Sequence, residues 1–465
     1  MKKEGYKEFP KPLSLTKLLG PSFIILALGL GSGEVILWPY LVSIYGLGIA
    51  WGALLGITFQ FLMNMEIERY AIVKGESVFV GLSRMFKWTP YWFIASTFIG
   101  FGIPGIIAAS AKVFSHLVGI SDLRFIAIPS LLIIGLILSS GRTVYGRMEK
   151  ITKFVILIGA PLVLLLAILL SGSADWAALG QGLIGKGEGF NFLPSGIALA
   201  TFLAAFAYAG AGGNLNLTQS IYIREKGYGM GKYSQKISGF FRSKKGERIR
   251  LAGRDFKVNK KNMDRFKVWW KRVNLEHLIV FWFIGLVTMS LLMLLSYITT
   301  YKSGQDLGTG IDFVISEGLI IGQTLFPTIG LLFLVAVVIM LFQTQLGVLD
   351  STSRIMAENF ALKKLGKNKE GTINMSKIYF IFLWAQIGFG ILLFLLNLYE
   401  PLVLIIIGAV INAFAMFVHV GLVNWMNYKV LPKEVQASII RKVMMVGIFL
   451  FLGIFSAVTL WDKLM

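Results

Sequence analysis

Long uninterrupted apolar runs constrain this chain more than any other feature of its sequence. The runs Leu325–Leu341 and Pro401–Met416 contain no charged residue, and comparable runs lie on both sides of them. A helix needs about 20 apolar residues to cross the hydrocarbon core of a bilayer. Of the 465 residues, 56% are hydrophobic and only 15% are charged, whereas about 25% are charged in a soluble domain. The sequence therefore predicts an all-α, polytopic membrane protein.

Polar breaks separate eleven candidate crossings. Their approximate cores are residues 17–43, 47–65, 90–115, 122–140, 151–171, 194–223, 277–298, 325–350, 376–397, 401–422 and 442–460. The connections alternate between basic and acidic, and lysine and arginine favour the cytoplasmic side of a membrane. We therefore expect a multi-pass protein of the cell (cytoplasmic) membrane, with its N-terminus in the cytoplasm and its C-terminus outside. The first apolar helix lacks a small-residue cleavage site and is expected to be retained.

The connection at residues 225–275 carries most of the excess charge. Between Arg224 and Arg272 there are 17 Lys or Arg residues against 4 Asp or Glu, which is more than half of the chain's net charge of +21. Residues 247–258 alternate apolar and polar around Ala252-Gly253, which indicates a small hairpin. Trp269-Trp270 is typical of an anchor at the membrane interface.

These features predict three parts of the chain. A first transmembrane block covers residues 1–224, a basic cytoplasmic insert 225–275, and a second transmembrane block 276–465. We expect the insert to contact anionic lipid, because polybasic segments beside a membrane are attracted to it. Nucleic acid is not an expected partner, because no base-stacking motif accompanies the charge.

Two crossings contain glycine clusters at mid-span, Gly29–Glu34 and Tyr208–Asn214. Such clusters unwind a helix at membrane depth where protein or a wet cavity satisfies the freed peptide groups. The clusters occupy the first helix of two successive five-helix blocks, which indicates an inverted-repeat transporter with a site at mid-membrane. The alternative is that both clusters are packing faces for neighbouring helices.

Polar side chains within the crossings add candidates for that site. A carboxyl group near the bilayer centre costs about 2.5–3.5 kcal/mol, so Glu34 is expected to have a partner or a function. Asn214, Gln343 and Asn412 are candidates to converge with it, whereas Gln219 and Thr344 are interpreted as helix–helix contacts. Candidate gating residues lie near the helix ends: Glu66, Arg69, Asp350, Arg354 and Glu358.

The composition also excludes several classes of chemistry. The chain has no cysteine, which excludes disulfides and thiolate sites. Its three histidines are too scattered for an H-E-x-x-H metal site. No nucleophile–base pair or cofactor motif stands out, so we expect neither enzymatic activity nor a cofactor.

Around the first glycine cluster the chain resembles the Nramp family of divalent metal transporters, which have the LeuT-type fold. Gly20-Pro21-Ser22-Phe23 and the residues that follow align without gaps with the family's first-helix motif. In this alignment the family's metal-binding Asp falls on Gly31 and its metal-binding Asn on Glu34. The Pro and Gly between them fall on Ser32 and Gly33.

The resemblance continues in the later crossings. The sixth-helix motif falls on Ala209 to Asn214, with the thioether ligand at Gly212 and the histidine at Asn214. Gln343 takes the place of a coordinating Gln in the eighth helix, and Asn412 the place of an amide in the tenth. The resemblance implies an inverted 5+5 repeat of about eleven helices, with helices one and six unwound at mid-membrane.

The resemblance also implies a substrate site. Its residues would be Gly31, Ser32, Gly33, Glu34, Ala209, Gly212, Gly213, Asn214, Gln343 and Asn412. Glu34, Asn214 and Gln343 would be the metal ligands. The family's acidic and sulfur ligands are replaced here, and the remaining oxygen donors suit Mg²⁺ better than a softer ion. The third crossing lacks the acidic residues of the family's proton route, so proton coupling would require Glu34 itself to carry the proton.

The leading hypothesis is an Nramp-like secondary transporter that moves an oxygen-preferring divalent cation, such as Mg²⁺, by alternating access. One alternative keeps the fold but changes the cargo to a small organic solute, because glycines widen the site and helix N-termini hold carboxylates. An alternative from another class is a non-transporting membrane sensor or scaffold that acts through the basic insert.

Overall fold

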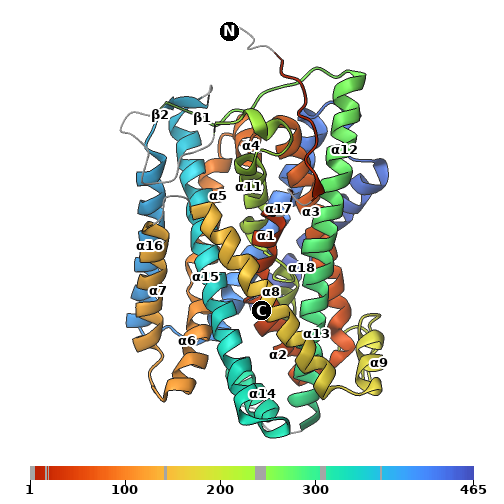
Figure 1. Ribbon diagram of the computed structural model, residues 1–465, viewed down its shortest axis with the longest axis vertical. Helices are drawn as coiled ribbons and strands as arrows, with labels where there is room; N and C mark the ends of the chain where they lie inside the picture. The colour runs from red at the N-terminus through yellow and green to blue at the C-terminus, as the bar shows by residue number, and fades with distance from the viewer. Residues whose placement is uncertain are drawn as a thin grey trace.

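The protein is an elongated helical bundle in the computed structural model, which describes residues 6–15, 18, 20–140, 144–235, 248–303, 310–366 and 369–464. Most helices run along the long axis (Figure 1). Residues 6–15, the start of α12 and the strands β1 and β2 lie at one end, here called the basic end. The helices α9 and α14 lie at the opposite end (Figure 1).

From Pro21 to Gly182, every regular element of the described residues is a helix. Its elements are α1 (Pro21–Gly29), the π-helical segment η2 (Gly33–Leu37), α2 (Trp38–Tyr45), η3 (Leu47–Ile49), α3 (Ala50–Lys74), α4 (Val78–Met85), α5 (Thr89–Gly102), α6 (Gly105–Val118), α7 (Arg124–Ser139), α8 (Val144–Leu170) and α9 (Ser173–Gly182). Pro21 begins α1 because proline has no amide hydrogen to lose at a helix start. Gly75 ends α3 with φ 68°, a left-handed conformation that glycine adopts without strain.

The second part contains the only two strands of the described residues. Its elements are α10 (Leu199–Ala207), η4 (Gly213–Leu217), α11 (Thr218–Lys226), η5 (Gly229–Tyr233), β1 (Arg248–Arg250), α12 (Lys260–His277), the π-helical segment η6 (Leu278–Phe283), α13 (Ile284–Thr299), η7 (Tyr301–Ser303), α14 (Asp312–Thr324), α15 (Pro327–Lys364), β2 (Glu370–Thr372), α16 (Met375–Leu395), α17 (Pro401–Val430), η8 (Lys433–Val435) and α18 (Ile439–Leu464).

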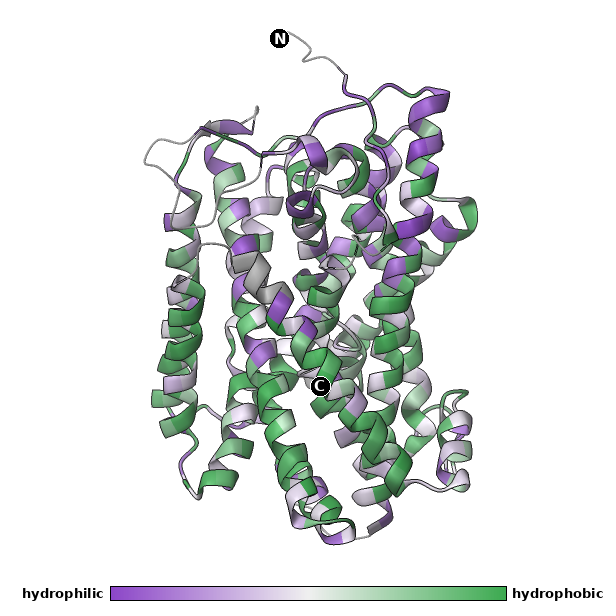
Figure 2. Cartoon of the chain, in the orientation of Figure 1, coloured by the Kyte–Doolittle hydropathy of each residue, from purple (hydrophilic) through white to green (hydrophobic). Residues whose placement is uncertain are grey.

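Within the described residues, nine helical stretches are long and apolar enough to cross a bilayer. They correspond to nine of the eleven predicted crossings. The other two crossings correspond to α7, a shorter apolar helix, and to the pair α10 and α11, which are short because a non-helical segment divides them. Hydrophobic residues dominate the middle of the bundle and hydrophilic residues the basic end (Figure 2). The chain is a multi-pass membrane protein.

The two glycine clusters have different backbone structures. In the sixth crossing α10 ends at Ala207, and the chain is non-helical until Gly213. Gly212 and Gly213 have φ values of 70° and 52°, which favour glycine. In the first crossing a turn over residues 30–32 leads directly into the π-helical η2. The first crossing therefore bulges, and its predicted unwinding is not confirmed.

The glycines of the first crossing allow it to approach the sixth. A Cβ atom on Gly33 would lie 1.7 Å from the carbonyl oxygen of Tyr208, and one on Gly29 would lie 2.6 Å from the backbone of Gly210. A Cβ on Gly31 would lie 2.6 Å from the Thr344 side chain of α15. For the first cluster the structure thus agrees with the alternative interpretation, a packing face for neighbouring segments.

The described part of the basic insert packs against the N-terminal segment. The Phe9 amide donates to Asn262 Oδ1 at 3.0 Å, and Trp269 Nε1 donates to the Pro10 carbonyl oxygen at 3.1 Å. Phe9 is fully buried, with its ring 4.8 Å from that of Phe256 and 5.9 Å from that of Phe266. Trp269 is therefore buried in protein, which corrects its predicted role as an interfacial anchor.

The predicted hairpin around Ala252-Gly253 does not form in the described part of the insert. Strand β1 pairs in antiparallel register with β2, a segment more than 100 residues away. The residues after the predicted turn pair elsewhere, since Phe256 forms a parallel bridge with Lys7. Alternating polarity predicts an extended strand but not its partner, and here the partner comes from the connection between α15 and α16. Glu247 lies outside the described residues.

Candidate functional site

The break in the sixth crossing lies at the centre of the candidate site. Gln60 of α3 satisfies two of its backbone groups: Nε2 donates to the Ala207 carbonyl at 2.9 Å, and Oε1 accepts from the Gly212 amide at 3.0 Å. His419 of α17 donates from Nε2 to the Gly213 carbonyl at 3.1 Å. Neither side chain was predicted as a site residue. Their isolated polar character within apolar helices was the available signal.

Asn412 of α17 contacts this break. Its Nδ2 donates to the Gly100 carbonyl and to the Tyr208 hydroxyl, both at 2.9 Å. Its Oδ1 is buried without a hydrogen-bond partner. A Cβ atom on Gly213 would lie 2.2 Å from that oxygen, so a glycine at this position lets the amide approach the backbone.

Asn214 extends the site towards α5. Its Nδ2 donates to Ser96 Oγ at 2.8 Å and to Thr97 Oγ1 at 2.9 Å. Its Oδ1 is also buried without a partner. Two asparagines on different elements thus each use the amide nitrogen for structural hydrogen bonds and leave a carbonyl oxygen unpartnered.

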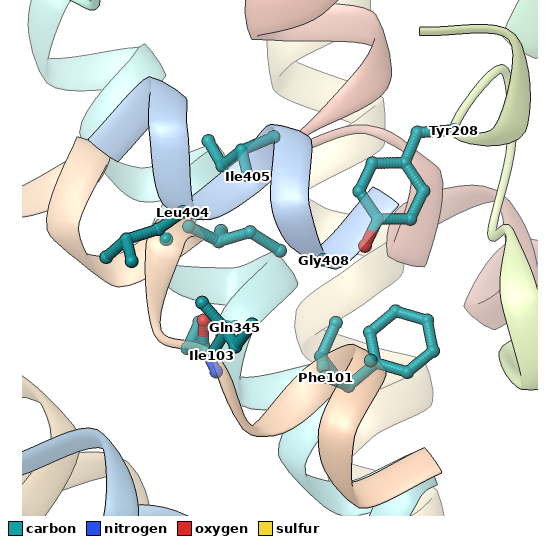
Figure 3. A pocket seen from close by; sticks show the side chains of 11 residues that line it. Phe101, Ile103, Tyr208, Gln345, Leu404, Ile405 and Gly408 are labelled. Atoms are coloured by element: carbon teal, nitrogen blue, oxygen red, sulfur yellow. The ribbon is translucent and has the colours of Figure 1, made fainter. Parts of the chain in front are cut away.

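A small cavity of about 10 Å³ adjoins this group, which is room for about one water molecule. Its polar side chains are Tyr208 and Gln345, and its other walls include Phe101, Val348 and Ile405. Figure 3 shows the Tyr208 hydroxyl pointing towards Gly408 of α17, with Phe101 on α5 beside the ring. The ring centroids of Phe101 and Tyr208 are 6.3 Å apart, with an angle of 24° between their planes.

Gln345 lines this cavity, whereas the predicted ligand Gln343 does not. Gln343 Nε2 donates to Thr152 Oγ1 of α8 at 3.1 Å. Successive residues of an α-helix are rotated by about 100°, so positions 343 and 345 of α15 face nearly opposite sides. The alignment selected Gln343 of α15, and the residue of this helix that lines the cavity lies two positions further along the chain.

Glu34 does not line the cavity either. A Cβ atom on Gly285 of α13 would lie 3.7 Å from Glu34 Oε1 and 2.7 Å from Ile57 Cδ1, so the carboxyl group lies in an apolar layer between helices. Glu34 is fully buried, and neither carboxylate oxygen has a hydrogen-bond partner within the described residues.

The structure therefore gathers part of the predicted site. Gly212, Gly213, Asn214 and Asn412 lie at or around the break, and Ala209 lies within it. Gly31 and Gly33 contribute close packing, and Ser32 is buried between them. Glu34 and Gln343 are directed towards α13 and α8 instead.

The predicted gating residues form buried ion pairs that link α11 to α15. Arg354 contacts Asp350 of its own helix and Glu225 of α11, each at 2.9 Å. Arg224 of α11 forms two hydrogen bonds of 2.8 Å with Glu358 of α15.

Glu66 and Arg69 form a separate buried pair on α3 at 2.9 Å. Arg441 of α18 lies 3.0 Å from the same Glu66 carboxylate. The Arg69 guanidinium also lies 3.9 Å from the centre of the Trp270 ring. Glu66 and Arg69 were predicted from the sequence, whereas Arg441 of α18, which also pairs with Glu66, was not.

Comparison with solved structures identifies the fold. A manganese transporter from Eremococcus coleocola, in complex with an aromatic bis-isothiourea substituted compound, superposes with a TM-score of 0.68 at 13% identity, over 98% of this chain and 90% of that chain. A variant of the same transporter gives a TM-score of 0.67 at 12% identity, with the same coverage. The chain has the Nramp-like form of the LeuT fold. The resemblance predicted from the sequence is thereby confirmed at the level of the fold.

A second similar structure widens the range of cargoes found on this architecture. Mhp1, a nucleobase-cation-symport-1 family transporter with bromovinylhydantoin bound, superposes with a TM-score of 0.54 at 12% identity, over 96% of this chain and 92% of that chain. No protein-family model and no curated protein sequence matches this chain. Cargo therefore has to be argued from the site itself, because fold alone does not determine function.

Proposed function

We propose that this chain is a secondary transporter that moves a small, oxygen-preferring cation by alternating access around the break between α10 and η4. The Nramp-like LeuT fold supports the transport role. The similar solved structures are a manganese transporter and a nucleobase-cation-symport-1 family transporter. No catalytic step is part of this proposal.

One observation carries the choice of a cation. The unpartnered side-chain atoms of Asn412 and Asn214 at the break are carbonyl oxygens, which only accept hydrogen bonds or bind cations. The orientation of the Asn412 amide follows from its neighbour, because the Gly100 carbonyl can only accept and therefore faces Nδ2. A carboxylate-bearing solute would meet these oxygens with like partial charges, whereas a cation or a donor group satisfies them.

The oxygen ligands of this site are uncharged, which limits how many of a cation's bound water molecules they can replace. Among the described residues, no group of three or more His, Asp or Glu side chains is arranged to hold a metal ion. Mg²⁺ gives up its water reluctantly and is commonly held with several waters retained. We propose Asn214 and Asn412 as contacts to such a partly hydrated ion, with Gln345 in place of Gln343. Glu34 lies outside this proposed contact set.

The basic end is proposed to face the cytoplasm, in keeping with the charge of its connections. In this orientation the α11–α15 ion pairs lie on the cytoplasmic side of the break and serve as its closed gate. The exposed lysines and arginines of the insert are proposed to contact anionic headgroups.

A second candidate cargo is a small organic solute with hydrogen-bond donors. The stacked rings of Phe101 and Tyr208 beside the cavity favour it, because paired aromatic side chains bind flat, apolar groups. A thermal-shift screen of metal salts against amino acids and nucleobases separates the two candidates, since only a ligand of the folded state raises the melting temperature by mass action.

The cation proposal predicts opposite outcomes for two substitutions. Asn412→Leu removes an oxygen ligand, and a hydrogen bond to a charged group is worth about 1.5–3 kcal/mol, so we expect KM for Mg²⁺ to rise at least about tenfold. Glu34→Gln changes a side chain that faces α13, so KM should stay within about twofold of the wild type. Uptake of Mg²⁺, Mn²⁺ and Ca²⁺ into proteoliposomes measures both.

Asn424→Leu is the matched control, because it makes the same change on the same helix in a groove with Phe417 and Trp425. Its KM should equal that of the wild type. A large loss of affinity in Glu34→Gln with an unchanged Asn412→Leu would reverse the ligand assignment. Absence of uptake of all three cations by the intact protein would reject the cation and favour the organic solute or the sensor alternative.

A further inference from the structure

The groove between α17 and α18 is separate from the break and from its proposed cation contacts. It encloses about 710 Å³, which is within the usual range of about 300–1,000 Å³ for small-molecule sites. One face of each helix lines it, together with the connection between α4 and α5. The α17–α18 connection lies beside the end of α3, because the Val435 carbonyl oxygen accepts a 3.0 Å hydrogen bond from Arg69. Since α4, which follows α3, lies at the basic end (Figure 1), the groove runs from that end towards the middle of the bundle.

The inner part of the groove is apolar. The rings of Phe417 and Phe449, one from each helix, stack with their centroids 4.6 Å apart and an angle of 22° between their planes. Gly421 permits this approach, because a Cβ atom there would lie 2.7 Å from the Phe449 ring. Leu422 of α17 and the exposed Val446 of α18 add to the same lining. This surface is therefore suited to contact with an acyl chain.

The outer part of the groove is aromatic and basic. Its aromatic side chains, Trp88, Trp425 and Tyr428, are all exposed. Lys429 Nζ lies 5.2 Å from the centre of the Trp425 ring, and Lys442 Nζ lies 4.9 Å from the centre of the Tyr428 ring. Exposed tryptophan and tyrosine gather where a membrane meets water, and lysines at that level attract anionic headgroups.

The depth of these residues matches the profile of one leaflet of a bilayer. With the break at mid-membrane, the helical rise places Phe417 about 8 Å and Leu422 about 15 Å from the level of Asn412 along α17. The hydrocarbon of one leaflet is about 15 Å deep, and its headgroup region continues to about 20–22 Å. Trp425 and Tyr428, at about 20 Å and 24 Å, are therefore at headgroup depth. The apolar part of the groove lies beside acyl chains and its basic part beside headgroups.

The charge at the outer end favours an anionic headgroup. Among the described residues that line the groove, Lys442 alone is charged. From Lys429 to Lys442 the chain has four basic residues and one acidic residue, the exposed Glu434. Lys442 Nζ donates to Gln436 Oε1 at 3.0 Å, and an ammonium group has two further hydrogens to offer a phosphate. A second copy of this chain is a poorer occupant, because a two-fold contact through the groove would bring the same lysines together.

We propose that this groove binds an anionic phospholipid of the leaflet at the basic end. One acyl chain lies along Leu422 and Val446, and the phosphate accepts hydrogen bonds from Lys442, with the positive charge of Lys429 beside it. The bound lipid contacts both helices and so holds α18 against α17. In turn α18 packs on α10, the helix that leads into the break. The lipid site is separate from the basic insert and does not depend on the identity of the cargo.

Thermal unfolding of the purified protein in detergent tests the headgroup selectivity. Phosphatidylglycerol should raise the melting temperature by at least about 4 °C more than phosphatidylcholine with the same acyl chains, since a ligand of the folded state stabilises it by mass action. In Lys429→Gln/Lys442→Gln this difference should fall below about 1 °C, and Lys429→Arg/Lys442→Arg should restore it. Lys363→Gln/Lys364→Gln is the matched control and should keep the full difference. These two lysines of α15 also lie over aromatic rings, at 4.6 Å and 5.0 Å, but do not line the groove.

Native mass spectrometry of the protein with added phosphatidylglycerol identifies the occupant. The wild type should retain bound phosphatidylglycerol. Val446→Trp fills the groove with a larger side chain and should lower the retained fraction at least about fivefold. Val443→Trp makes the same change at an exposed position of α18 that does not line the groove, and it should retain lipid as the wild type does.

Three results would overturn the proposal. Equal shifts of the melting temperature with the two lipids in the wild type would remove the selectivity for an anionic headgroup. An unchanged lipid difference in Lys429→Gln/Lys442→Gln, or full lipid retention by Val446→Trp, would place the lipid elsewhere on the protein. A lipid-free dimer that Val446→Trp dissociates would assign the groove to a second copy of this chain.

Discussion

Gly33→Ala is expected to abolish transport and to destabilise the protein by about 3 kcal/mol or more. The added methyl group would lie 1.7 Å from the Tyr208 carbonyl oxygen, which is backbone and has no rotamer to change. The first crossing must therefore move away from the break. Because Asn412 bonds to the Tyr208 hydroxyl, that movement also disturbs the proposed cation contacts. Mg²⁺ uptake and the thermal melting temperature of the purified protein measure the two effects.

Gly388→Ala provides the matched control for this substitution. It adds the same methyl group to a transmembrane helix, α16, at a position with no neighbouring atom within 4 Å. We expect uptake and melting temperature to equal those of the wild type, because alanine is also the better helix former. Normal uptake by Gly33→Ala would mean that the first and sixth crossings are not in close contact in the working protein.

Arg224→Met is expected to lower the free energy of unfolding by about 3–5 kcal/mol. The Arg224 and Glu358 side chains are only 3% and 2% exposed, so removing one partner leaves a buried charge that water does not reach. The pair also joins α11 to α15, and the loss should open the basic end more often. Unfolding in sodium dodecyl sulfate, followed by tryptophan fluorescence, measures the change in stability.

The double variant Arg224→Met/Glu358→Met distinguishes a buried charge from lost packing. Replacing both members of a buried pair by apolar side chains is often neutral or stabilising, so we expect stability within about 1 kcal/mol of the wild type. Lys261→Met removes an ion pair whose side chains are 59% and 61% exposed, and it should cost less than about 1 kcal/mol. Additive losses in the double variant would contradict the electrostatic explanation.

The candidate site was predictable only in part from the sequence. The alignment identified Asn214 and Asn412, because an amide within a long apolar run stands out wherever the helix faces. It selected Gln343, whereas Gln345 lines the cavity, and it grouped Glu34 with the other polar residues, although that side chain faces α13. The direction in which a side chain points depends on how its helix is rotated about its own axis, and packing determines that rotation. A π-helical turn such as η2 shifts the rotation relative to a regular helix.

Gln60 and His419 show a second kind of information that the sequence lacks. Each satisfies backbone groups of a segment more than 140 residues away. No local pattern near either residue indicates this partner. The same is true of the pairing between β1 and β2. It is also true of the hydrogen bond between Phe9 of the N-terminal segment and Asn262 of α12.

The sequence by itself determined that the chain crosses a membrane many times, that its sixth crossing is interrupted, and that it has an Nramp-like fold. The first two properties follow from the solvation of long apolar runs and from the backbone freedom of glycine, which are local in the chain. The third rests on the resemblance of short motifs to a known family. Only the tertiary structure decided which side chains meet at the break and which acid lies apart from it. Those choices depend on distances between helices remote in sequence, and a difference of one or two residues in facing changes them completely.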